Sequence, residues 1–186
     1  MIERWSNASV ALHWMTAALV AGLAAAGFVM SDLPADANLR QLLARSHTVF
    51  GILLMVLTVA RLVVRWRGRS PAPLPLAPLH RRGVDVVHGL IYVVLFGLGA
   101  SGVATAAGSA WPAYVSGELA SAPALEQLAS RKVHEVLVLT LLGLVGLHVT
   151  GVLIQQLRGV PVVARMLPGK KRSPKPTDPV GSREPG

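Results

Sequence analysis

Long apolar runs separated by short polar stretches are the main feature of this chain. Four of the runs reach or approach the roughly 20 residues that a helix needs to cross a bilayer core about 30 Å thick. Neither aspartate nor lysine occurs deep inside a run, and Arg61 and Glu135 stand near run ends, where long side chains reach the membrane interface. The pattern predicts four transmembrane helices, over about 9–30, 46–64, 86–107 and 132–156.

The links between these runs are short enough to join antiparallel neighbours, which predicts an up-down-up-down bundle. The expected fold class is therefore all-α. One integral membrane four-helix domain covers residues 1–167, and a basic tail over 168–186 follows, whose composition favours disorder. In the first link, Pro34 and Asp36 are expected to end one helix and to cap a short one that runs through Leu43.

The other two links have their own signatures. Residues 65–83 contain the stretch SPAPLPLAPLH, whose prolines favour extended backbone over helix. Residues 108–130 are long for a connector in a compact bundle, and long loops often carry function. Trp111 and Tyr114 in this third link are expected to form an interfacial aromatic pair.

The charge of the chain first suggests that it binds nucleic acid, because its formal net charge is +9 at neutral pH. No basic groove interleaved with aromatic residues accompanies that charge, which argues against nucleic acid. All but four of the 18 lysines and arginines lie before the first run, in or after the end of the second, or after the fourth. The positive-inside rule then places both termini and the second link in the cytoplasm, beside anionic lipid.

The chain has no cysteine, which excludes disulfides, iron–sulfur clusters, thiolate-ligated haem and covalent CxxCH haem attachment. An ionisable side chain within a membrane helix is costly unless it is paired, solvated or ligated. One such histidine would be explained by a hydrogen bond at a helix interface, but at least one on each predicted helix indicates ligands. The histidines in question are His13, His47, His88, His134 and His148, whereas His80 lies in the proline-rich link.

The depths of these histidines follow from the alternating helix directions. His134 and His148 are 14 residues apart, a rise of about 21 Å and a rotation about 40° short of four full turns. One helix face therefore presents an imidazole to each half of the membrane. On the periplasmic side His47 meets His134. On the cytoplasmic side His148 meets His13 or, as the less favoured partner, His88.

Two imidazoles on facing helices can clamp a haem iron from both sides, and such an iron has no open position. Zinc and copper sites instead prefer three or four ligands close together, often with carboxylate or sulfur. Histidines divided between two distant pairs therefore predict two haems b stacked across the bilayer. That arrangement forms an electron path between the two membrane faces.

From Trp5 to about Arg172 the chain resembles the bacterial cytochrome b561 family. No single matching stretch is specific to this family. The order of the stretches, their depth in the membrane and the 14-residue spacing of the last two histidines are specific when taken together. The fold also resembles the cytochrome subunits of membrane formate dehydrogenases and nickel hydrogenases. The matching stretches are ALHW, RSHTVFGILL, ARLVVRW, VVHGLIYVVLFGLGASG, RKVHEVL, GLHVTGVL and RMLPGKKR.

The resemblance implies a multi-pass protein of the bacterial inner membrane with two haem b groups. It implies that His13 and His148 ligate the cytoplasmic-side haem and that His47 and His134 ligate the periplasmic-side haem. His88 is then a non-ligand, available to hydrogen-bond a quinone carbonyl or to relay its proton. The other reading of His88 is a helix-end histidine bonded to a neighbouring backbone group.

Some members of the family are similar to a membrane superoxide oxidase, which takes an electron from superoxide and reduces ubiquinone. The resemblance therefore implies superoxide as a periplasmic donor and ubiquinone as the acceptor. Arg45, Arg131 and Lys132 lie beside the periplasmic histidines and are candidates for attracting an anion. The alternative is that these three side chains are only interfacial anchors.

Other functions stay open at this point. The chain would also suit a membrane anchor and electron conduit for a separate dehydrogenase or periplasmic redox protein, and a homodimer is compatible with either role. A third hypothesis is non-redox: a small helical transporter or assembly factor that uses its histidines for metal or protons.

Overall fold

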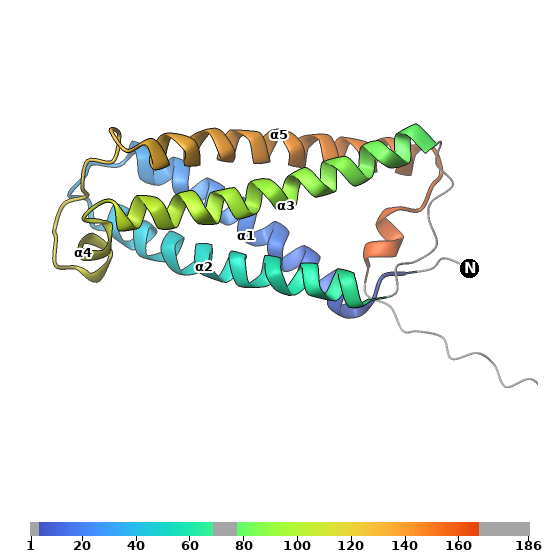
Figure 1. Ribbon diagram of the computed structural model, residues 1–186, viewed down its shortest axis with the longest axis horizontal. Coiled ribbons are helices and arrows are strands. Elements are labelled where there is room, and N and C mark those ends of the chain that lie inside the picture. Colours follow the sequence, from blue (N-terminus) through green and yellow to red (C-terminus); the bar gives the residue numbers. More distant parts are fainter. Residues whose placement is uncertain (1–3, 69–77, 168–186) are drawn as a thin grey trace, which may run out of the picture.

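The computed structural model describes residues 4–68 and 78–167, and within them the chain is helical with no strand. Four helices are long and apolar enough to cross a membrane, so the predicted all-α four-helix class is confirmed. They run side by side along the long axis of the molecule, with alternating directions (Figure 1). The elements are α1 (Asn7–Asp32), α2 (Asn38–Arg67), α3 (Pro78–Ala107), the short α4 (Trp111–Ser116), α5 (Ala129–Leu157) and the 3-10 helix η1 (Val163–Met166).

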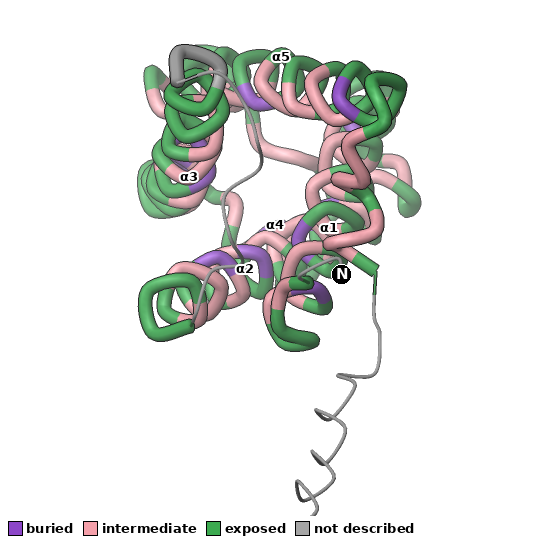
Figure 2. Tube along the Cα trace, turned by 90° about the vertical axis from the view of Figure 1, so that its right-hand side faces the viewer, coloured by how far each residue is buried: buried purple, intermediate pink, exposed green. Residues whose placement is uncertain are grey.

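The four long helices pack as two close pairs. α1 lies along α2 and α3 lies along α5, whereas α2 touches α3 much less. Seen along the bundle, buried residues lie mainly on helix sides that face other helices, and the outer sides are exposed (Figure 2). Large apolar side chains are abundant on those outer sides, as expected of a surface that faces lipid. The central core is small and consists of Leu54, Val94, Leu95 and Leu141.

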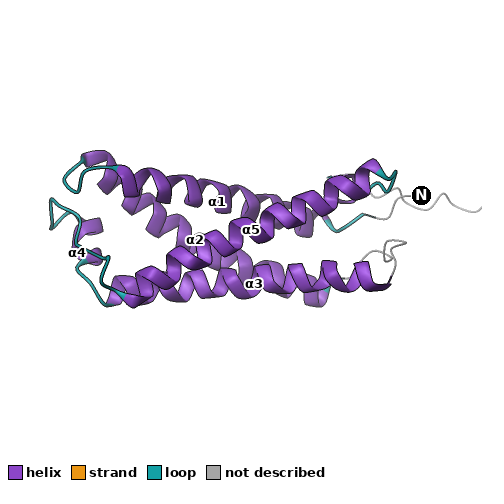
Figure 3. Cartoon of the chain, turned by 90° about the horizontal axis from the view of Figure 1, so that it is seen from above, coloured by secondary structure: helices purple, strands orange, loops and turns teal. Residues whose placement is uncertain are grey.

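The two ends of the bundle differ and are named here for use below. The basic end holds the start of α1, the end of α2, the start of α3, the end of α5 and η1. The α4 end holds the opposite helix ends and α4 (Figures 1 and 3). At the basic end, the indole Nε1 of Trp14 donates to the carbonyl of Met166 at 2.8 Å, and the backbone N–H of Trp5 donates to the carbonyl of Arg165 at 3.2 Å. The C-terminal part of the described chain therefore packs back onto the start of α1.

One expectation about the first link was wrong. No separate short helix runs through Leu43, because α2 begins at Asn38 and continues through that residue. Residues 44–50 contain no glycine or proline that would stop a helix. α3 begins at Pro78 and so extends beyond the predicted span over 86–107, since proline is well tolerated in a first helical turn. Hydrophobicity marks only the part of each helix that lies in the bilayer. Residues 69–77 of the proline-rich link and the predicted tail at 168–186 lie outside the described residues.

The expected interfacial pair of Trp111 and Tyr114 was also only half right. The rings do lie together, with centroids 5.9 Å apart. Tyr114, however, is fully buried and packs in a cluster with Met30 and Ala44, because α4 folds back over the ends of α1 and α2. The indole Nε1 of Trp111 donates to the hydroxyl of Thr48 at 3.1 Å. This loop therefore closes the α4 end of the bundle.

Candidate cofactor site

Two pairs of histidine rings face each other across the bundle, one toward each end. His13 on α1 faces His148 on α5 at the basic end, with ring centroids 6.3 Å apart and ring planes at 66°. His47 on α2 faces His134 on α5 toward the α4 end, with centroids also 6.3 Å apart and planes at 63°. Each pair joins α5 to the α1–α2 pair, across the gap between the two close helix pairs. The structure thus brings together the histidines that depth alone had paired.

The spacing of both pairs suits one metal ion held between two rings. An imidazole nitrogen bonds a metal at about 2 Å and lies about 1 Å from its own ring centroid, so trans ligands place their centroids about 6 Å apart. The angle between the ring planes is free, because each ring can turn about its metal–nitrogen bond. The residues present therefore fit a group that takes two axial imidazoles, such as haem.

His88 lies beside the basic-end pair, but its ring is closer to His148 than the ring of His13 is. Its ring centroid is 5.0 Å from that of His148, with the planes at 75°, which is close contact with too little room for a metal between the rings. Its Nδ1 lies 2.8 Å from the carbonyl oxygen of Val84, so the ring donates there. Of the two candidate partners for His148, the spacing favours His13.

The four paired rings differ in what their Nδ1 atoms contact. Nδ1 of His134 lies 3.0 Å from the hydroxyl of Ser101, and that hydroxyl donates to the carbonyl of Leu98 at 3.1 Å. The serine oxygen therefore accepts from Nδ1–H, which leaves Nε2 of His134 free to bind a metal. Nδ1 of His47 is buried and makes no hydrogen bond of good geometry among the described residues, and the polar group that the His47 ring interacts with is the backbone of Leu23. Nδ1 of His13 lies 2.8 Å from Nη2 of Arg61.

Glycines stand where neighbouring helices pass the histidines of the α4 end. A Cβ added at Gly27 on α1 would lie 3.6 Å from Cε1 of His47, and one added at Gly102 on α3 would lie 3.7 Å from Cε1 of His134. At Gly22 and Gly143 an added Cβ would meet nothing within 4 Å. Close helix packing therefore does not account for these last two glycines, and they leave space beside α1 and α5.

The three candidate anion-attracting cations all lie toward the α4 end, but two of them have protein partners. Nε of Arg45 donates to the carbonyl of Val115 at 2.7 Å and so holds α4 against α2. Nη2 of Arg131 forms an ion pair with Glu135 one helical turn along α5, at 2.9 Å. Lys132 is exposed. These contacts give Arg45 and Arg131 structural roles, whatever they contribute to the electrostatic field.

Within residues 4–68 and 78–167, no group of three or more histidine or carboxylate side chains is arranged to hold a metal ion. The zinc or copper alternative needs three or four close ligands, so this part of the chain offers it no donor set.

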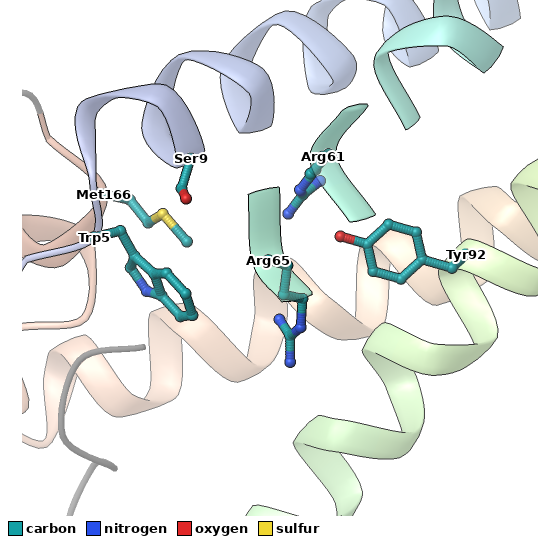
Figure 4. Close-up of a pocket in the computed structure, with 6 residues that line it drawn as sticks. All are labelled: Trp5, Ser9, Arg61, Arg65, Tyr92 and Met166. Carbon is teal, nitrogen blue, oxygen red and sulfur yellow. The ribbon is translucent and has the colours of Figure 1, made fainter. Parts of the chain in front are cut away.

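Sequence reasoning missed two side chains beside the histidines, Ser101 and Arg61. Arg61 also lies with its guanidinium carbon 5.7 Å from the ring centre of Tyr92. A small cleft beside it, drawn in Figure 4, is lined by Trp5, Ser9, Arg61, Arg65, Tyr92 and Met166. Depth alone would have grouped Arg61 with His13, because one stands near the end of α2 and the other near the start of α1.

Comparison with known proteins gives the family. The sequence profile described as prokaryotic cytochrome b561 matches residues 4–169. Cytochrome b561 homolog 2 of Escherichia coli K12 is 37% identical over 103 residues, 54% of each chain. Cytochrome b561 homolog 1 of the same organism is 27% identical over 113 residues, 59% of this chain and 64% of the relative. The matched part thus spans only about half to two thirds of these curated relatives.

No solved structure matches the chain significantly. The family profile, however, covers nearly the whole sequence and agrees with the four apolar helices. This protein therefore belongs to the prokaryotic cytochrome b561 family.

Proposed function

We propose that the protein binds two haems b and passes electrons between the two faces of the bacterial inner membrane. His13 and His148 would hold one haem at the basic end, and His47 and His134 would hold the other toward the α4 end. The observation that carries the proposal is the common 6.3 Å spacing of both ring pairs. When bound, haem would supply one-electron redox chemistry, and a site made of two imidazoles suits electron transfer.

The protein's part is to hold and orient the ligands. α5 provides one imidazole to each pair, and their separation of 14 residues is a rise of about 21 Å along one helix face. Ser101 fixes the His134 tautomer by accepting from Nδ1–H, so that Nε2 is the metal-binding nitrogen. The small residues Gly27 and Gly102 keep side chains away from the rings of His47 and His134.

The basic end is proposed to face the cytoplasm, which puts both termini on that side. The support is the distribution of lysine and arginine, which are concentrated at the helix ends that form the basic end. The pair His47–His134 then lies toward the periplasm, on the side of the proposed donor, and the pair His13–His148 lies toward the cytoplasm, on the side of the proposed acceptor.

We propose a quinone, ubiquinone in particular, as the acceptor near His88. This ring lies in contact with His148 and donates Nδ1–H to Val84. The Nε2 atom of neutral His88 can therefore only accept a hydrogen bond. It follows that His88 donates to a quinone carbonyl only when it is protonated, and in that form it also carries a proton for the reduced quinone.

Superoxide is the proposed donor on the α4 side. Two superoxide ions lose one electron each and become dioxygen, while one quinone takes up two electrons and two protons. The cations Arg45, Arg131 and Lys132 would raise the local concentration of a small anion through their summed field. Lys132 and Arg45 contribute more to this attraction than Arg131 does, since both are exposed and the charge of Arg131 is offset by Glu135.

The experiment that tests the function is a spectrum of purified protein, with pyridine haemochrome analysis, followed by rapid mixing. We expect two haems b per chain, reduction of both by superoxide without a protein partner, and reoxidation by ubiquinone. Fewer than one haem per chain, in protein made with ample haem, would overturn the cofactor assignment. Two haems that superoxide does not reduce, in protein that co-purifies with a catalytic subunit, would instead favour an electron conduit for a dehydrogenase.

A further inference from the structure

A guanidinium within a membrane-spanning helix needs an explanation, and Arg61 is such a group. It is half-buried near the end of α2, with Nη2 2.8 Å from Nδ1 of His13 and its guanidinium carbon 5.7 Å from the ring centre of Tyr92. Among the described residues no carboxylate lies within ion-pair distance of it. Charged side chains in membrane helices are costly and mark functional sites by default.

The contact between Arg61 and His13 is incompatible with His13 binding iron through Nε2. Arginine can only donate, so Nδ1 of His13 accepts the hydrogen bond and the ring carries its proton on Nε2. A neutral imidazole that binds iron through Nε2 carries its proton on Nδ1, where it would point at another donor. When His13 becomes an axial ligand, Arg61 must therefore leave it and find an acceptor elsewhere.

The surroundings of Arg61 are suited to an anion. Arg65 lies one helical turn further along α2, with its guanidinium carbon 6.0 Å from the ring centre of Trp5. Both arginines line the same small cleft, and the hydroxyl of Tyr92 is directed toward Arg61 (Figure 4). Two neighbouring guanidiniums repel each other in a medium of low dielectric constant, and an anion between them removes that repulsion.

We propose that Arg61, supported by Arg65, binds a propionate carboxylate of the haem held by His13 and His148. The inference rests on the proposed function and adds a cofactor-binding residue outside the four axial ligands. Haem b carries two propionates, and a guanidinium is the side chain best matched to a carboxylate, through two parallel hydrogen bonds. A haem carboxylate is preferred to a lipid headgroup because Arg61 contacts the proposed ligand itself, whereas Arg65 is the exposed member of the pair.

The first measurement is the midpoint potential and haem content of purified protein with Arg61→Gln. We expect the basic-end haem to be lost in part or to shift to a lower midpoint potential, because the removed positive charge favoured the reduced state. The haem toward the α4 end should keep its potential. Arg61→Lys should give a smaller shift. The matched control is Arg158→Gln, which removes the same charge from an exposed position at the same end.

The second measurement identifies the anion. Protein made in cells that cannot synthesise haem is loaded with iron protoporphyrin IX or with its dimethyl ester, in which both carboxylates are masked. We expect Arg61→Gln to retain less of the basic-end haem than the wild type does when both are loaded with the natural haem, and we expect no such difference in retention with the ester, because the ester has no carboxylate for Arg61 to bind. A difference of the same size with the ester would overturn the proposal and indicate a lipid phosphate instead.

Failure of this inference can be told apart from failure of the proposed function. A wild-type protein with two haems b, in which Arg61→Gln changes neither haem content nor potential, overturns only the role of Arg61. A wild-type protein without b-type haem absorption overturns both.

Discussion

The imidazoles of the two pairs differ in their second contacts, and for His134 and His13 that contact decides which ring nitrogen carries the proton. Ser101 accepts from His134, whereas Arg61 can only donate to His13. The ring of His88 has the backbone partner that an axial ligand often has, but it stands too close to His148 to share a metal with it. The two sites are therefore expected to differ in potential although both use two imidazoles.

The assignment of ligands makes a direct prediction at this scale. His148→Ala should remove the basic-end haem and leave the other largely in place, so that haem content falls to about half of the wild-type value by pyridine haemochrome analysis. His88→Ala is the matched control, because His88 contacts His148 without sharing a metal. Loss of a haem in His88→Ala with full retention in His13→Ala would show that His88 is the ligand instead.

Ser101 provides a second test of the residue-level contacts. A hydrogen bond that accepts Nδ1–H makes a histidine ligand more basic, which stabilises oxidised iron and lowers the midpoint potential. Ser101→Ala should therefore raise the midpoint potential of the α4-end haem. The ceiling is about 40 mV, since a net hydrogen bond contributes about 1 kcal/mol. Thr140→Ala, which removes an exposed hydroxyl from α5, the helix that carries His134, should leave both potentials unchanged in a redox titration.

At the scale of elements, α5 is the common support of both pairs and α4 closes one end. The turn after α4 depends on Gly117, whose φ of 97° is in the left-handed region. An added Cβ there would lie 2.6 Å from Nη2 of Arg45, the side chain that holds α4 through the carbonyl of Val115. Backbone conformation and close packing therefore both require glycine at this position.

A pair of glycine substitutions separates these two requirements. Gly117→Ala should lower thermal stability by the cost of a left-handed alanine, about 1–2 kcal/mol, plus the displacement of Arg45. Gly159→Ala has a similar φ of 80° but nothing within 4 Å of the added Cβ, so it should incur the backbone cost alone. The measurement is the Tm of haem-loaded protein in detergent. Equal losses of Tm would argue against the contact with Arg45.

At the scale of the whole molecule, the apolar outer surface suits contact with lipid, and the paired histidine rings face one another inside the bundle. The close pairs α1–α2 and α3–α5 each bury their own contacts, and the proposed haems join one pair to the other through His13–His148 and His47–His134. The cofactor is therefore expected to stabilise the assembled bundle, in addition to the small central core that already joins the two helix pairs.

Orientation is also a property of the whole molecule, and the absence of native cysteine makes it easy to measure. Single cysteines are placed at Ser121, exposed at the α4 end, and at Arg158, exposed at the basic end. In cells with a permeabilised outer membrane, a thiol reagent that does not cross the inner membrane should label Ser121→Cys and spare Arg158→Cys until the cells are lysed. The reverse pattern would place the termini in the periplasm.

The number of spanning helices and the depths of the histidines were determined by the sequence alone. The reason is that both follow from local quantities: apolar length against bilayer thickness, and a fixed rise per helical residue. The facing of His134 and His148 on one side of α5 was predictable in the same way. Helix ends were not, because each helix continues beyond its apolar run, to Asn38 in α2 and to Pro78 in α3.

Only the tertiary structure decided which side chains of different helices come into contact. The ring centroid of His148 lies 6.3 Å from that of His13 and 5.0 Å from that of His88. Both distances depend on how α1 and α3 are rotated and displaced relative to α5. The same is true of Arg61 beside His13, and of Tyr114 buried under a loop that was expected to lie at the interface. Helical periodicity fixes height and facing along one helix, but lateral neighbours result from the packing of all the helices together.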